Sequence, residues 1–111
     1  MTYRLKFTDI SNKEWTKLGS TVKEQFKKKL KQRVLNPRVP KDKLSGYKNI
    51  YKIKLRASGF RLIYEVKDEQ IVVLVLTVGK RENNKVYKDL EDRVEWYILY
   101  YLYCHLHLHT S

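Results

Sequence analysis

Residues 51–64 read Tyr51-Lys52-Ile53-Lys54-Leu55-Arg56-Ala57-Ser58-Gly59-Phe60-Arg61-Leu62-Ile63-Tyr64. Apolar and cationic residues alternate on both sides of the serine–glycine pair. This period of two predicts a half-buried β-hairpin with a tight turn. If Ser58 and Gly59 form a two-residue loop, the expected cross-strand pairs are Arg56 with Arg61, Leu55 with Leu62, and Ile53 with Tyr64.

The two faces of this hairpin differ in chemistry. The apolar face, predicted to be core, carries Tyr51, Ile53, Leu55, Phe60, Leu62 and Tyr64. The other face, called the cationic face below, carries Lys52, Lys54, Arg56 and Arg61. Like charges opposed across two strands cost stability unless an anion lies over them. The cationic face therefore predicts a ligand that carries phosphate.

The charge of the whole chain agrees with an anionic ligand. Its 111 residues include 24 Lys and Arg against 12 Asp and Glu, a formal net charge of +12. This length has room for one domain with one modest core. So positive a charge is a common footprint of nucleic-acid binding. A membrane-surface role fits less well, because the basic residues alternate on predicted strands as well as lying on helices. Cys104 has no partner for an internal disulfide and no apolar signal segment follows Met1, so we expect a cytoplasmic protein.

Two helices are expected between residues 11 and 36. Ser11-Asn12-Lys13-Glu14 and Thr21-Val22-Lys23-Glu24 match the capping box, so a helix should start at each. Gly19-Ser20 separates the two helices, and Pro37 ends the second because proline has no N–H to donate. The apolar side of this helical hairpin is formed by Trp15, Leu18, Val22, Phe26 and Leu30.

Strands on either side complete the predicted fold. Residues 2–7 alternate apolar and basic side chains, as a strand with one buried face does. Residues 71–78 form a continuous apolar run, rich in β-branched side chains, that is typical of a central strand covered on both faces. Residues 36–49 read as a loop. We predict an α+β fold, with a small antiparallel-rich sheet of about four strands and an N-terminal helical hairpin packed on one face.

Basic residues outside the hairpin add further candidate contacts to nucleic acid. The outer face of the second helix holds several lysines, for which a solvated surface is the commoner explanation. The net charge slightly favours the other explanation, that these lysines attract nucleic acid. Lys80 belongs to the cluster Gly79-Lys80-Arg81-Glu82 at an expected strand end, where an ordinary polar exit is the alternative. The candidate contacts are Lys23, Lys27, Lys28, Lys31, Arg56 and Lys80.

Five segments carry a resemblance to a known family. They are Lys13-Glu14-Trp15, Lys17-Leu18-Gly19-Ser20-Thr21-Val22, Tyr51-Lys52-Ile53-Lys54-Leu55-Arg56, Gly59-Phe60-Arg61-Leu62 and Val78-Gly79-Lys80-Arg81-Glu82. The chain resembles the RelE-type toxins of bacterial toxin–antitoxin systems, in the RelE/ParE superfamily, from about Tyr3 to Tyr87. The resemblance implies a RelE-like microbial RNase fold over residues 1–90. It also implies cleavage of messenger RNA (mRNA) in the A site of the 30S ribosomal subunit, beside 16S rRNA, and neutralisation by a RelB-like antitoxin that wraps around the toxin.

The resemblance assigns catalytic roles to five residues. Lys52 and Lys54 match the family's paired lysines, Arg61 its phosphate-contacting arginine, Arg81 its second catalytic arginine, and Tyr87 its C-terminal tyrosine. Ser45 departs from the pattern, because a basic residue is frequent there. This departure should weaken RNA contact rather than chemistry.

The same residue types suit RNA cleavage without a metal or cofactor. A deprotonated 2′-hydroxyl attacks the adjacent phosphorus, provided that transition-state charge is balanced and the leaving oxygen is protonated. Crowded cations disfavour one another's charge, so we expect lysine pKa values lowered toward neutrality. We assign Lys52 and Lys54 to proton transfer without distinguishing acid from base, Arg61 and Arg81 to phosphate charge, and Tyr87 to positioning.

Residues 91–111 form a tail that has no counterpart in the family pattern. It is densely aromatic and ends in the alternation His105-Leu106-His107-Leu108-His109. Zinc binding by the histidines is one interpretation, and an incidental alternation is commoner. The tail fits a lineage-specific extension, a self-association segment or an altered reading frame. Two other functions stay open: an RNA-binding module without catalysis, and a toxin homologue that is inactivated by its C-terminus and only binds an antitoxin.

Overall fold

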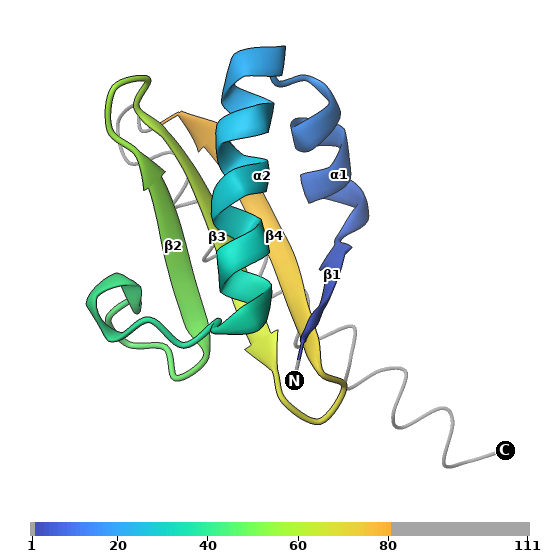
Figure 1. The fold of residues 1–111 in the computed structure, drawn as a ribbon, viewed down its shortest axis with the longest axis vertical. Coiled ribbons are helices and arrows are strands. Elements are labelled where there is room, and N and C mark those ends of the chain that lie inside the picture. Colours follow the sequence, from blue (N-terminus) through green and yellow to red (C-terminus); the bar gives the residue numbers. More distant parts are fainter. Residues whose placement is uncertain (1, 81–111) are drawn as a thin grey trace, which may run out of the picture.

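A four-stranded mixed sheet forms the centre of the structure, a computed structural model that describes residues 2–80 (Figure 1). Its strands are β1 (Arg4–Phe7), β2 (Ile50–Leu55), β3 (Phe60–Lys67) and β4 (Val72–Lys80). The spatial order is β1-β4-β3-β2. β1 runs parallel to β4, and the other neighbours are antiparallel. The continuous apolar run therefore lies in a central strand, as predicted.

Two helices, α1 (Asp9–Thr16) and α2 (Ser20–Leu35), cover one face of this sheet (Figure 1). Phe26 and Leu30 of α2 are buried against the apolar face of the β2–β3 hairpin. Trp15, Leu18 and Val22 pack around the same core. The predicted α+β fold with a helical hairpin on one face is confirmed. No helix within residues 2–80 has both the length and the apolar character needed to cross a membrane.

Both helices begin earlier than the capping boxes predict. α1 starts at Asp9, and the Thr8 side chain accepts a hydrogen bond from the Ser11 N–H at 3.1 Å. Ser11 is buried, and its hydroxyl donates to the Val75 carbonyl at 2.7 Å. The Glu14 carboxylate accepts from the Val78 N–H at 3.2 Å. These two polar side chains therefore fasten α1 to β4 instead of capping a helix. α2 starts at Ser20, after a Gly19 cap that makes no side-chain hydrogen bond.

The hairpin register differs from the prediction by two residues. The observed pairs are Leu55 with Phe60, Lys54 with Arg61, and Ile53 with Leu62. The loop therefore has four residues, 56–59, and Gly59 closes it in the left-handed region at a φ of 78°, which glycine adopts without strain. A shift of two residues preserves the face of each side chain that stays in a strand, but the prediction that Arg56 lies on the cationic strand face is wrong, because Arg56 falls in the turn. The shift also places Lys54, rather than Arg56, directly opposite Arg61.

The sheet face that points away from the helices also carries an apolar cluster. Its buried members are Leu44, Ile50, Ile63 and Leu76. Leu44 comes from the segment between α2 and β2, which is a loop as predicted apart from a short 3-10 helix, η1 (Pro40–Asp42). The cationic face therefore occupies only the end of the hairpin near the β2–β3 turn. The apolar cluster lies beside it on the same sheet face.

Candidate functional site

Three of the five predicted catalytic residues converge on adjacent strands. Lys52 and Lys54 alternate along β2, and Arg61 of β3 pairs with Lys54. All three side chains are half-buried and share the face that carries Ile63. Within residues 2–80 none of the three forms an ion pair with a carboxylate. The structure therefore holds three cations together without neutralising them.

This crowding lowers the pKa of Lys54. The main cause is the positive charge of Lys52, and smaller contributions come from partial desolvation and from the charges of Arg61 and Arg56. A lysine with a lowered pKa has a larger neutral fraction near physiological pH, so its amine is better able to accept a proton. The predicted direction of the shift thus holds for Lys54.

Arg61 and Thr77 add unsatisfied polar groups to the same face. The Nε of Arg61 and the hydroxyl of Thr77 are buried and have no hydrogen-bond partner in the part of the chain that the structure describes. Native structures rarely leave such groups unpaired, so each calls for an explanation. Gly79 of β4 pairs with Arg61 on the side away from Lys54. Because Gly79 lacks a side chain, it leaves space beside Arg61 among the residues that the structure describes.

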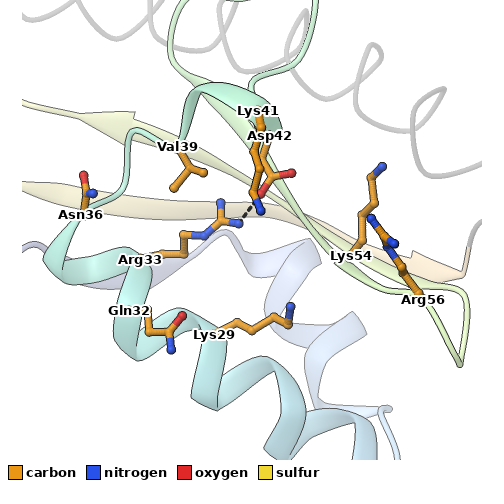
Figure 2. A pocket seen from close by; sticks show the side chains of 9 residues that line it. All are labelled: Lys29, Gln32, Arg33, Asn36, Val39, Lys41, Asp42, Lys54 and Arg56. Atoms are coloured by element: carbon orange, nitrogen blue, oxygen red, sulfur yellow. Dashed lines mark hydrogen bonds and ion pairs between the residues drawn. The ribbon is translucent and has the colours of Figure 1, made fainter.

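A basic groove begins at this site and continues around the edge of β2. One hollow of about 580 Å³ lies between α2, η1 and β2 (Figure 2). A second, of about 420 Å³, adjoins it and shares Lys29, Lys54 and Arg56 with it. We call the two together the α2–β2 groove. Among the described residues Asp42 is the single carboxylate that lines it, and this side chain is paired with Arg33. The cations that line the groove are Lys28, Lys29, Arg33, Lys41, Lys54 and Arg56.

The predicted nucleic-acid contacts fall into two groups. Lys28 and Arg56 line the α2–β2 groove, whereas Lys23, Lys27 and Lys31 lie elsewhere on α2. Lys27 pairs with Glu24 at 3.2 Å. Lys80 is exposed at the end of the described chain, with its ammonium 5.5 Å from the centre of the Phe60 ring. The sequence did not single out Lys29, Arg33 or Lys41 as site residues, because only the folded chain brings η1 beside α2.

Several predicted features lie outside the described residues. These are the catalytic candidates Arg81 and Tyr87, and the whole tail with Cys104 and its histidines. Their roles stay predictions. Within residues 2–80, no three His, Cys, Asp or Glu side chains gather as metal ligands would.

A small α+β fold with an unneutralised cationic site matches one class of proteins. The model for the "ParE toxin of type II toxin-antitoxin system, parDE" family matches residues 5–85. This chain belongs to that toxin family.

Individual relatives make the likeness more specific. The chain is 52% identical over 94 residues to the mRNA interferase toxin RelE of Escherichia coli K12, covering 85% of this chain and 99% of that protein. The crystal structure of the isolated E. coli RelE toxin in its P21 form shares 51% identity and a TM-score of 0.71, over 83% of this chain and 98% of that one. The toxin in the intact E. coli RelBE toxin–antitoxin complex shares 54% identity and a TM-score of 0.71, over 73% of this chain and 99% of its own length.

Proposed function

We propose that this chain is the toxin of a toxin–antitoxin pair and acts as a ribosome-dependent endoribonuclease that cleaves mRNA in the ribosomal A site. The observation that carries the proposal is the convergence of Lys52, Lys54 and Arg61 on one sheet face, where no carboxylate of residues 2–80 forms an ion pair with them. A relative that is 52% identical over nearly its whole length and is named an mRNA interferase toxin supports the same activity. The inhibition of translation follows from the loss of intact message.

The cationic face provides the groups that metal-independent cleavage needs. Lys52 and Lys54 transfer protons: one accepts the proton of the 2′-hydroxyl, whose oxygen then bonds to phosphorus. The other donates a proton to the 5′-oxygen as its bond to phosphorus breaks. Arg61 balances the charge that develops on the phosphate. Arg81 and Tyr87 are proposed, by family resemblance alone, to add a second phosphate contact and a positioning contact. The products are a 2′,3′-cyclic phosphate and a 5′-hydroxyl.

The ribosome supplies what this small site lacks. Histidine, the usual proton carrier near neutral pH, is absent from residues 2–80. Much of the rate must therefore come from RNA that something larger holds in attack geometry. The α2–β2 groove gives the protein a surface for phosphates of the 30S A site and 16S rRNA. A RelB-like antitoxin binds the toxin and blocks the site. We place these events in the cytoplasm, and we propose residues 1–90 as the toxin domain, with residues 91–111 as an added tail.

Cleavage of ribosome-bound message tests the proposal. The purified chain is incubated with naked RNA and with the same RNA on programmed ribosomes, and the new ends are identified chemically. We expect little cleavage of naked RNA, and A-site cleavage with 2′,3′-cyclic phosphate ends on ribosomes. Binding to ribosomes without cleavage would favour the non-catalytic RNA-binding module. Equal rates on both substrates would contradict the dependence on the ribosome.

A further inference from the structure

The side chain of Arg33 contacts several other elements of the fold, although Arg33 lies on a lysine-rich helix. Its side chain is 12% exposed and reaches from α2 toward η1 and the sheet (Figure 2). One guanidinium nitrogen, Nη2, donates to the Asp42 carboxylate. The other, Nη1, donates to the Tyr64 hydroxyl at 2.9 Å and to the Lys52 carbonyl at 3.2 Å. One side chain thus joins α2, η1, β2 and β3.

The contact with Lys52 matters because β2 is an edge strand of the sheet that residues 2–80 form. Backbone groups on a free strand edge have no neighbouring ladder to hold them. Here the Ile50 carbonyl accepts from the Leu44 N–H at 2.9 Å, and two residues further on the Lys52 carbonyl accepts from Arg33. Arg33 therefore takes the place of a neighbouring strand at the point where β2 presents its first candidate catalytic lysine.

The partners of Arg33 fix it in turn. The Tyr64 hydroxyl donates to the Pro37 carbonyl at 2.6 Å, which ties the segment after α2 to β3. The guanidinium also lies 5.8 Å from the centre of the Tyr64 ring. Asp42 neutralises the charge of Arg33 and holds one nitrogen of its planar guanidinium group. Lysine could not replace Arg33, because its ammonium lacks this planar arrangement of donors.

We infer that Arg33 is a positioning residue of the cleavage reaction, which acts by holding the Lys52 backbone so that Lys52 and Lys54 stay in line with Arg61. This inference rests on the proposed function, because it takes Lys52 and Lys54 as the proton carriers. Small displacements of reacting groups are costly, since misplacement by about 1 Å can lower a rate by about a hundredfold.

A competing explanation makes Arg33 a phosphate-binding cation of the α2–β2 groove. The two explanations predict opposite effects of Asp42→Asn. If Arg33 binds phosphate, loss of the carboxylate frees its charge, so ribosome binding tightens and bound-state cleavage is kept. If Arg33 positions β2, loss of the carboxylate loosens the guanidinium, so bound-state cleavage falls although the protein becomes more positive.

Single-turnover cleavage on programmed ribosomes separates the two. We expect Asp42→Asn to lower the rate at saturating protein by about ten- to a hundredfold without weakening association. Glu69→Gln, in the exposed turn between β3 and β4, makes the same charge change and should leave the rate unchanged. Tyr64→Phe removes only the hydroxyl that binds Arg33 and Pro37, and should lower the rate in the same way. Denaturant unfolding verifies that each variant is folded, and a cleavage rate kept by both folded variants would overturn the inference.

Titration of Lys54 by NMR in the free chain gives a readout that does not depend on cleavage. The charged groups around Lys54 within residues 2–80 are Lys52, Arg61 and Arg56, together with those that line the groove with it: Lys28, Lys29, Arg33, Lys41 and Asp42. Removing a carboxylate by itself can only lower the pKa of Lys54. If Lys52 is released from its fixed place, its charge acts less strongly on Lys54, so the pKa of Lys54 would instead rise toward the ordinary lysine value. A rise in Asp42→Asn and in Tyr64→Phe supports the inference, and a fall or no change contradicts it.

The two readouts also separate this inference from the proposed function. If the wild-type chain does not cut RNA on ribosomes, the proposed function fails, while the Lys54 titration still decides whether Arg33 holds Lys52. If the wild type cuts and both variants cut equally well with unchanged titrations, only the positioning role of Arg33 is lost.

Discussion

Gly79 places no side chain beside Arg61 in the cationic site. It pairs with Arg61 inside β4, where glycine weakens a strand and often marks the close approach of a ligand. A Cβ built there meets no heavy atom of residues 2–80 within 4 Å, and the φ of Gly79 lies outside the left-handed region. Fold stability alone therefore gives no reason for glycine at this position.

We predict that Gly79→Ala folds at least as stably as the wild type but cleaves more slowly. Alanine loses less backbone entropy on folding, by about 0.5–1 kcal/mol, and its methyl would project beside Arg61, where the phosphate is proposed to lie. Unfolding curves and single-turnover cleavage on ribosomes measure the two effects. Gly19→Ala, also in open space but remote from the sheet face, should leave cleavage unchanged. Full activity of Gly79→Ala would show that no ligand passes over this position.

Lys52 sets the pH range in which Lys54 can exchange a proton. Its charge is the main cause of the lowered pKa of Lys54. In Lys52→Met, the pKa of Lys54 should therefore rise toward the ordinary value of 10.5. With Lys54 as the base, the rising limb of the pH–rate profile should move to higher pH, separately from any drop in the maximal rate. A limb that stays in place in Lys52→Met would mean that Lys54 is not the titrating base.

Among the secondary-structure elements, Asp68 joins three segments that are remote in sequence. It lies in the turn between β3 and β4 and accepts hydrogen bonds at 2.6 Å from the Tyr3 hydroxyl and from the Arg38 guanidinium. Arg38 also donates to Asn49 at 3.0 Å, ahead of β2. The hydrogen bonds from Tyr3 and Arg38 lower the pKa of the Asp68 carboxyl below its ordinary 3.8.

The sign of this shift predicts an acid-sensitive contribution to stability. Because the folded-state pKa is lowered, the contribution is complete above pH 3.8 and is lost as the pH falls through the folded value. Asp68→Asn should therefore lower the free energy of unfolding at neutral pH, and the difference from wild type should shrink in acid. Tyr3→Phe, which removes one of the two donors, should show a smaller difference with the same pH dependence. A difference that is constant with pH would contradict this account.

The hairpin shows how much of the site follows from sequence. Alternation alone places Lys52, Lys54 and Arg61 on one face, because strand side chains have a period of two. It cannot fix the register, since two-residue and four-residue loops preserve the same faces. Pairing of Lys54 with Arg61 therefore emerges only from the structure.

The predictions of where the two helices start are wrong for a different reason. Ser11 and Glu14 have the local pattern of a cap, yet both bond to the backbone of β4, 64 residues away. Local pattern carries no information on such partners. The role of Arg33 is hidden in the same way, because its contacts with Asp42, Lys52 and Tyr64 exist only after α2 packs beside the sheet.

Across the molecule as a whole, we propose two separable uses of positive charge. The net charge of +12 is expected to attract nucleic acid from a distance, whereas the few cations near Lys54 are proposed to act on one phosphate. Exposed lysines of α2 belong to the first kind. Their attraction is screened by salt and does not depend on the stage of the reaction. Docking and chemistry should therefore respond to different substitutions.

We predict that the paired change Lys28→Gln with Lys31→Gln weakens ribosome association but preserves bound-state cleavage. Each lost phosphate contact should reduce the slope of the log association constant against log salt by about one, because fewer counterions are released. Lys13→Gln with Lys17→Gln removes the same charge from the exposed side of α1 and its C-cap, and serves as the control. Association across a salt series and single-turnover cleavage at saturation measure the two quantities. An equal fall in association and in bound-state cleavage for the α2 pair would mean that α2 takes part in the chemistry. An equal loss of association for the α1 pair would mean that only total charge matters, and that the lysines of α2 do not direct docking.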